Sequence, residues 1–134
     1  MSSRGGILMK FKHLMTIKAV ICLFFGVLLV VLPEELLSIL GITVGVGGIF
    51  MARLYGASLI GNLMLTWFGR NAEESATKRA IILDLFAYDA VGLVVAFIAQ
   101  IGGLMNPLGW FIVFIYFFLT IGFGYFLMAK RSPA

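Results

Sequence analysis

Residues 90–129 read AVGLVVAFIAQIGGLMNPLGWFIVFIYFFLTIGFGYFLMA and contain no charged side chain. A helix needs about 20 mainly apolar residues to cross the hydrocarbon core of a bilayer, so this stretch is too long for one span. The segment GGLMNP at 102–107 interrupts it with residues that break helices and form turns. The stretch therefore predicts two antiparallel membrane-spanning helices, over 79–101 and 108–128, joined by a short turn.

Two further apolar stretches of spanning length precede this pair, over 13–32 and 49–69. Pro33 ends the first of them, because a proline disfavours helical geometry in the residue before it. Hydrophobic residues make up 62% of the chain and charged residues 12%, against roughly 45–50% and 25% in soluble domains. This composition excludes a soluble enzyme, a disordered tail and a disulfide scaffold. We expect an all-α fold, a single integral membrane bundle of four transmembrane helices over residues 1–134.

The connection over 33–48 is unusually apolar. Pro33 suits the first position of a short helix, in which Glu34 and Glu35 would interact favourably with the helix dipole. Gly41 would end this helix, since glycine readily adopts the left-handed conformation found there. We expect the helix to lie on the membrane surface through its apolar residues, which are Leu36, Leu37, Ile39 and Leu40.

The positions of the basic residues indicate the orientation of the spans. The chain carries ten Lys+Arg against six Asp+Glu, and the basic residues flank the apolar stretches. They are Arg4, Lys10, Lys12 and Lys18, then Arg70, Lys78 and Arg79, then Lys130 and Arg131. The 33–48 connection has no Lys or Arg, so the positive-inside rule predicts that both termini are cytoplasmic. We expect the membrane to be a prokaryotic inner or plasma membrane. Basic residues placed in this way indicate the lipid bilayer as a partner and argue against nucleic acid.

Ionisable side chains inside the spans are the first candidates for function, because burying them in a bilayer is costly. On a helical wheel, Asp84, Tyr88 and Asp89 share one face of the third span with small residues, while bulky apolar residues occupy the opposite face. Small residues allow close helix approach, so this face is expected to point into the bundle. Asp89 lies about 15 Å of helical rise into the span, near the membrane midplane.

The second span carries a matching polar stripe of Tyr55, Ser58, Asn62 and Thr66. Facing the third span, this stripe would form a pocket for a ligand or ion, made by Asp89, Asn62, Tyr88, Tyr55 and Ser58. Asp89 would then bind a proton or cation. The alternative is that these side chains only hold helices together, within the bundle or against a partner subunit. In either case Asp89 needs a partner, water or a proton.

Two buried ion pairs are also expected from the depths of the charged residues. Lys18 and Asp84 both lie about one turn inside the same boundary, and we expect them to pair. Arg53 lies about one turn inside the opposite boundary, near Glu34 and Glu35, and can pair with either.

No pattern of catalytic or cofactor-binding residues is evident. His13 is the single histidine, so no Ser/His/Asp arrangement or His/Cys/carboxylate cluster with metal spacing is formed. Cys22 is the single cysteine and cannot form an internal disulfide. We expect no catalytic residue, no metal site and no cofactor.

Two short motifs resemble the DoxX-like group of small four-helix membrane proteins. They are LPEELLSILG at 32–41, which follows the first span, and ARLYGA at 52–57, which opens the second. The resemblance covers most of the chain and implies a four-helix membrane fold. One member of that group is linked to a respiratory quinone oxidoreductase, and no catalytic residue can be carried over from it.

These observations favour a non-catalytic multi-pass membrane protein. It would be an accessory or assembly subunit of a membrane complex, or a homo-oligomer. The alternative is a small proton- or cation-coupled transporter or channel that uses Asp89. A third class is a quinone- or lipid-handling component of a membrane oxidoreductase.

Overall fold

A computed structural model of the chain describes residues 10–129, which form five helices joined by short connections and contain no strand. The helices are α2 (Phe11–Val31), α3 (Pro33–Ile39), α4 (Val46–Gly69), α5 (Ala76–Ile101) and α6 (Gly109–Met128). Helices α2, α4, α5 and α6 are each long and apolar enough to cross a membrane. The expected all-α bundle with four membrane-spanning helices is therefore confirmed.

The helix boundaries differ from the expected spans mainly at the N-terminal ends. Helices α2, α4 and α5 begin two or three residues before 13, 49 and 79, whereas all four C-terminal ends agree within one residue. A hydropathy window misses polar first turns, such as the one that contains Lys78 in α5. That turn is fixed by Ser75, whose hydroxyl accepts a hydrogen bond from the Lys78 amide at 3.1 Å.

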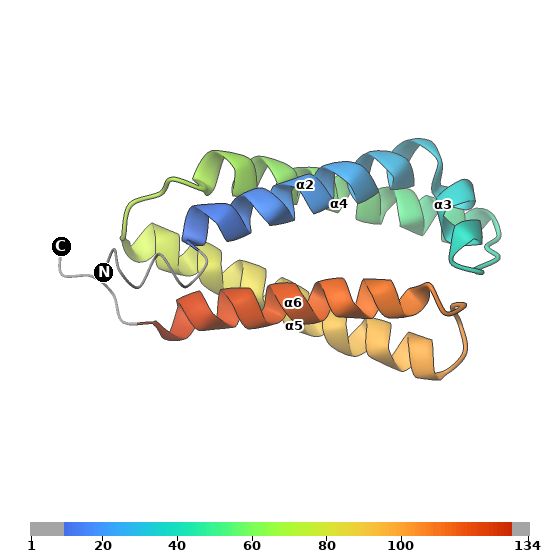
Figure 1. The fold of residues 1–134 in the computed structure, drawn as a ribbon. Coiled ribbons are helices and arrows are strands. Elements are labelled where there is room, and N and C mark those ends of the chain that lie inside the picture. Colours follow the sequence, from blue (N-terminus) through green and yellow to red (C-terminus); the bar gives the residue numbers. More distant parts are fainter. Residues whose placement is uncertain (1–9, 130–134) are drawn as a thin grey trace.

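The long helices form two hairpins, one of α2 with α4 and one of α5 with α6 (Figure 1). Two glycines bring α2 and α4 close together. A Cβ atom on Gly56 would lie 2.9 Å from the carbonyl oxygen of Gly26, so only a residue without a side chain fits there. The two hairpins meet where α2 packs against α6.

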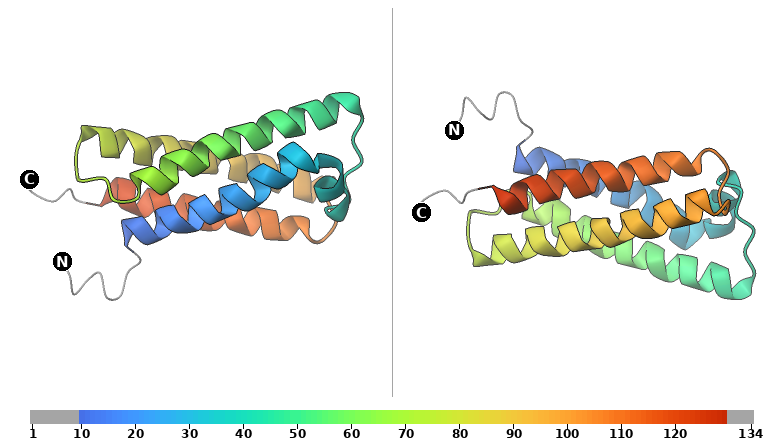
Figure 2. Two further views of the ribbon diagram at one scale, coloured as in Figure 1. Left: turned by 90° about the horizontal axis from the view of Figure 1, so that it is seen from above. Right: turned by 90° about the horizontal axis from the view of Figure 1, so that it is seen from below.

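The hairpins pack against each other at one end and separate toward the other. We call the end that holds the 70–75 connection the loop end, and the end that holds α3 the distal end (Figures 1 and 2). At the loop end, one core cluster takes residues from both hairpins: Leu14, Met15, Leu85, Leu119 and Phe123. Toward the distal end, the cluster of Cys22, Leu29 and Leu59 comes from the first hairpin alone. The space between the hairpins therefore widens toward the distal end.

Helix α3 turns back toward the space between the hairpins. Asn106, in the turn between α5 and α6, donates a side-chain hydrogen bond to the Ile39 carbonyl at 2.9 Å. The backbone N–H of Asn106 donates a second hydrogen bond to the Leu40 carbonyl, also at 2.9 Å. Gly41 ends this segment with a φ of 81°, the left-handed conformation expected there. Leu36 and Leu40 line the interior of the bundle, whereas the sequence predicted that they rest on the membrane surface.

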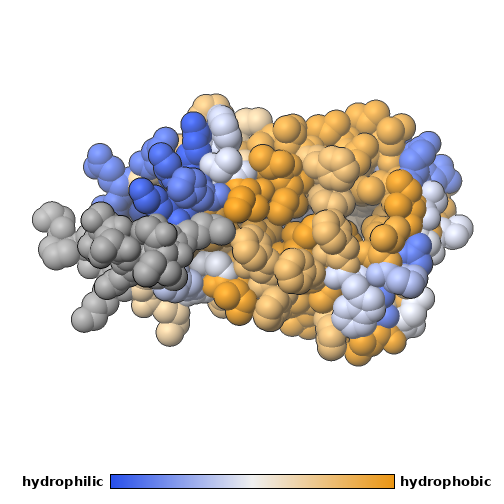
Figure 3. Space-filling view, viewed as in Figure 1, coloured by the Kyte–Doolittle hydropathy of each residue, from blue (hydrophilic) through white to orange (hydrophobic). Residues whose placement is uncertain are grey.

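Apolar residues cover the middle of the molecule in Figure 3, and hydrophilic residues gather at both of its ends. Trp67 lies near the loop end of α4, where the Arg70 guanidinium stacks on its ring at 3.8 Å from the ring centroid. Trp110 lies in the first turn of α6, at the distal end. Aromatic residues at both ends of an apolar band are typical of membrane proteins. Arg4, Lys130 and Arg131, which contributed to the expected orientation, lie outside the described residues.

Candidate functional site: a cavity with a buried ion pair

A cavity of about 740 Å³ lies between the two hairpins, and every helix of the described range contributes to its wall. Most of the wall is apolar, formed by side chains such as Ile21, Phe25, Leu59 and Ile112. The polar and ionisable side chains of the wall are Lys18, Cys22, Tyr55, Asp84, Tyr88, Asp89 and Tyr116. A largely apolar cavity with a few convergent polar groups is the usual form of a small-molecule site, and this volume lies within the common range.

A buried ion pair is the main polar feature of the cavity. The Lys18 ammonium lies 2.6 Å from a carboxylate oxygen of Asp89, and the two side chains are 2% and 0% exposed. The pair joins α2 to α5 and thus links the two hairpins. The Lys18 ammonium also lies 4.6 Å from the centre of the Tyr88 ring, within the range of a cation–π interaction.

The expected partner of Lys18 was wrong. The structure pairs Lys18 with Asp89, one turn and a half further along α5 than Asp84. Asp84 is exposed at the rim of the cavity and makes no ion pair within residues 10–129. Counting residues from the ends of the spans placed Lys18 and Asp84 at the same depth in the membrane. The tilt of the helices and the length of the lysine side chain instead bring the Lys18 ammonium to Asp89.

Two polar atoms beside the ion pair lack partners. The second carboxylate oxygen of Asp89 (Oδ2) and the Tyr88 hydroxyl are both buried and make no hydrogen bond to the part of the chain described. Unpaired buried polar atoms are costly and mark places where a further partner would be stabilising. The unpaired atoms therefore point to the region of the cavity next to Asp89.

Two tyrosines cross the cavity near the ion pair. The Tyr55 hydroxyl of α4 forms a hydrogen bond with the Tyr116 hydroxyl of α6. The Tyr116 ring packs on Gly92, where a Cβ atom would approach the ring to 2.3 Å. Gly92 therefore provides the space that Tyr116 occupies, and the contact helps to hold α5 and α6 together on this side of the cavity.

Two residues of the expected pocket are absent from the cavity wall. Ser58 does not line the cavity but lies beside the Tyr88 hydroxyl. Asn62 does not line it either, and the Asn62 side-chain nitrogen has no hydrogen-bond partner in the described range. The expected approach of Asn62 to Asp89 is therefore not formed. Thr66, on the same stripe, is fully buried and donates to the Asn62 carbonyl at 2.7 Å.

The second expected ion pair is not formed either. Arg53, Glu34 and Glu35 are all exposed, and none of them makes an ion pair within residues 10–129. Arg53 lies in the distal third of α4, about two turns after the helix begins at Val46. Glu34 and Glu35 occupy the first turn of α3. The turn of α3 toward the cavity leaves these charges on the surface.

Sequence reasoning missed Tyr116 and the contribution of α3. Tyr116 stands among so many aromatic residues of α6 that its sequence environment gives no signal. The small residue Gly92 on the polar face of α5 was a signal of close approach, but not of which side chain would fill the space. Cys22 also lines the cavity and is buried with a free thiol.

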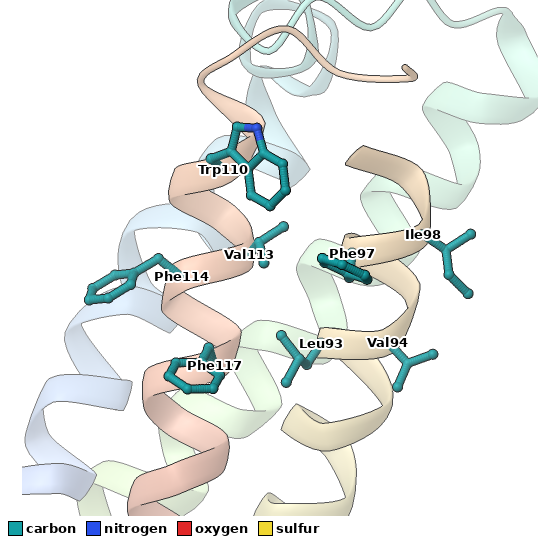
Figure 4. A pocket seen from close by; sticks show the side chains of 8 residues that line it. All are labelled: Leu93, Val94, Phe97, Ile98, Trp110, Val113, Phe114 and Phe117. Atoms are coloured by element: carbon teal, nitrogen blue, oxygen red, sulfur yellow. The ribbon is translucent and has the colours of Figure 1, made fainter. Parts of the chain in front are cut away.

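A second hollow lies on the outer surface of α5 and α6 and has a volume of about 730 Å³. Figure 4 shows its lining side chains, of which Phe97, Trp110, Phe114 and Phe117 are aromatic. The indole nitrogen of Trp110 is the single polar side-chain atom of this lining. The groove has nothing that would select a ligand from the lipid chains around it, so the inter-hairpin cavity is the better candidate site.

The fold and the site together define a class: an all-helical, multi-pass membrane bundle with a cavity between two helical hairpins. No family model, curated protein or solved structure matches the chain. The assignment of function therefore rests on the cavity and its residues.

Proposed function

We propose that this chain is a non-catalytic multi-pass membrane protein that binds a lipophilic small molecule in the cavity between its hairpins. The observation that carries the proposal is the cavity itself, with a volume of about 740 Å³, an apolar wall and a buried Lys18–Asp89 pair. Surface area buried in an apolar wall supplies affinity, and a few polar groups supply orientation.

The side of the cavity between α4 and α5 supports access from the bilayer. These two helices cross each other in the views of Figure 2 and diverge toward the distal end. Val91 and Val95 of α5 line the cavity and are still 63% and 62% exposed, and Tyr55 of α4 is 38% exposed. Lining residues that are also exposed indicate an opening, which in a membrane would face lipid. A lipophilic ligand would then enter from the membrane in which it is already dissolved.

We propose further that the protein serves as an accessory or assembly subunit of a membrane complex or as a homo-oligomer, with both termini cytoplasmic in a prokaryotic inner membrane. The basic residues Arg70, Lys78 and Arg79 around the 70–75 connection support this orientation. The motifs at 32–41 and 52–57 support a relationship with the DoxX-like group. Helix α3 and the turn at 102–108 would then lie on the opposite side of the membrane.

Photoaffinity labelling in lipid nanodiscs tests the binding function. A dodecyl probe that carries a diazirine and an alkyne should label peptides of the cavity wall, and excess unlabelled dodecanol should suppress the labelling. Ala96→Phe, and as a second variant Ala52→Phe, should lower the labelling because both residues line the cavity. Ala57→Phe is the control, since Ala57 is an exposed residue outside the cavity wall. Labelling that is uniform along the lipid-facing helices and cannot be competed would refute the function.

A second candidate function is proton- or cation-coupled transport through Asp89. The unpaired second oxygen of Asp89 favours this candidate. The Lys18 ammonium would compete with a transported cation for the carboxylate, so transport would require the pair to open. Reconstitution in liposomes with a pH-sensitive dye tests this function. If Asp89→Asn leaves proton and cation movement unchanged, the carboxylate is not the coupling site.

A further inference from the structure

The charge balance of the cavity limits the head group of a ligand. Lys18 and Asp89 neutralise each other inside the wall, at 2.6 Å. A charged head group beside them would add an uncompensated charge to an apolar site, which is strongly unfavourable. Asp84 also reaches the wall but is exposed at the rim, where solvent and lipid head groups screen its charge. The inner part of the cavity therefore favours a neutral head group.

The unpaired atoms limit the head group further. Asp89 is fully buried, and its Oδ2 oxygen, which is unpaired within residues 10–129, can only accept a hydrogen bond. The Tyr88 hydroxyl is also buried and makes no hydrogen bond of normal geometry there, although Ser58 and Tyr55 lie beside it; it can donate or accept. A ketone or ether could satisfy Tyr88 but would leave Oδ2 of Asp89 without a donor. A hydroxyl group can donate to Asp89 and accept from Tyr88 at the same time.

The shape of the cavity indicates the direction in which the apolar part of the ligand extends. Lys18 and Asp89 lie at the part nearer the loop end, where the core cluster of both hairpins closes the space. From there the wall continues toward the distal end through apolar residues, among them Leu29, Ala96 and Met105. A ligand that places its head group at Asp89 would extend its apolar part toward α3.

From this geometry we infer that the cavity selects a neutral lipophile with a hydroxyl head group, such as a long-chain alcohol or a phenol. The inference rests on the proposed binding function and specifies its ligand. The hydroxyl donates a hydrogen bond to Oδ2 of Asp89 and accepts one from Tyr88, while the apolar chain lies along the wall toward the distal end. Hydrogen bonds to a charged group are the stronger ones, so a preference of about tenfold over the same chain without a head group is expected.

A panel of dodecyl photoprobes that differ only in the head group tests this preference. Each probe carries the same diazirine and alkyne, and the head groups are hydroxyl, methyl, methyl ketone, carboxylate and primary amine. The quantity measured is the competable labelling of cavity-wall peptides in nanodiscs at equal membrane concentration of probe. The hydroxyl probe should label about tenfold better than the methyl probe and better than the ketone. The two charged probes should label the least.

Variants of the ion pair should change the preference in a defined direction. Asp89→Asn leaves the Lys18 charge unbalanced, so the carboxylate probe should gain most in that variant. Lys18→Met leaves the Asp89 charge unbalanced, so the amine probe should gain most there. Tyr88→Phe removes one hydroxyl and should lower only the preference for the hydroxyl probe. Glu73→Gln is the control and should leave the ranking unchanged, because Glu73 is exposed in the 70–75 connection and outside the cavity wall.

The outcomes separate this inference from the function on which it rests. If no probe gives competable labelling of the cavity, the binding function itself is wrong. If the methyl and hydroxyl probes label the cavity equally well, binding stands and the hydroxyl inference is overturned. A charged probe that labels the unaltered protein best would also overturn it. If the ion-pair variants no longer elute as a single species in size-exclusion chromatography, the test rests on Tyr88→Phe alone. Loss of the hydroxyl preference in Tyr88→Phe supports the inference, and an unchanged preference overturns it.

Discussion

Replacing Lys18 with methionine removes the cation that pairs with Asp89 and leaves a carboxylate in an apolar wall. At a separation of 2.6 Å and an effective dielectric constant of about 20, Coulomb's law gives an attraction of about 6 kcal/mol. Desolvation of two ions costs several kcal/mol each and offsets most of this attraction. The pair as a whole therefore adds little net stability, but loss of either partner should cost about 3–5 kcal/mol.

A double-mutant cycle measures this coupling. We expect Lys18→Met and Asp89→Asn each to lower the free energy of unfolding, and the double variant to cost less than either single one. Reversible unfolding in mixed micelles of a mild detergent and SDS, followed by circular dichroism, gives these free energies. Lys12→Met and Asp84→Asn are matched controls, because both residues are exposed and each change should stay within about 0.5 kcal/mol. If the losses of unfolding free energy in the two single variants add up to the loss in the double variant within about 0.5 kcal/mol, the two charges are not coupled and the reasoning fails.

The contact of α2 with α4 predicts opposite effects for two glycines of α4. Gly56→Ala should destabilise by about 1–3 kcal/mol, because its Cβ would meet backbone and side-chain atoms of α2 at 2.9 Å. Gly61→Ala, where nothing lies within 4 Å, should be neutral or stabilise by up to about 1 kcal/mol in the same unfolding assay. Equal effects of the two changes would contradict the close packing. For the orientation, a cysteine at Thr43 in a Cys22→Ala background should react with a membrane-impermeant maleimide in intact cells. A cysteine at Glu73 should react only after the cells are opened, and the reverse pattern would place the termini outside.

Most of the secondary structure could be predicted from the sequence, because its causes are local. The four spans follow from the length of the apolar stretches, and the breaks between them follow from residues such as Pro33 and the glycines of 102–107. The short helix that begins at Pro33 and the left-handed Gly41 after it were also predictable from neighbouring residues alone. The predictions failed at the polar first turns, since a hydropathy pattern carries little information about residues near the membrane boundary.

The candidate site could be predicted only in part. The helical wheel placed Asp89 and Tyr88 on the inner face of α5, and both line the cavity. A wheel describes one helix at a time, so it could not give the relative tilt of α2 and α5, on which the partner of Lys18 depends. It also could not show that α3 turns inward, because that turn depends on the hydrogen bonds of Asn106.

The sequence by itself determined that this chain is an apolar four-span helical protein, because helix length and helix breaks depend on neighbouring residues. The tertiary structure alone decided that Lys18 pairs with Asp89 and that a cavity lies beside the pair. The physical reason is the uneven packing of the two hairpins. A core cluster that includes Leu14 and Phe123 joins them at the loop end, whereas the cluster around Leu59 stays within the first hairpin. The space left between them is a property of helices far apart in the sequence.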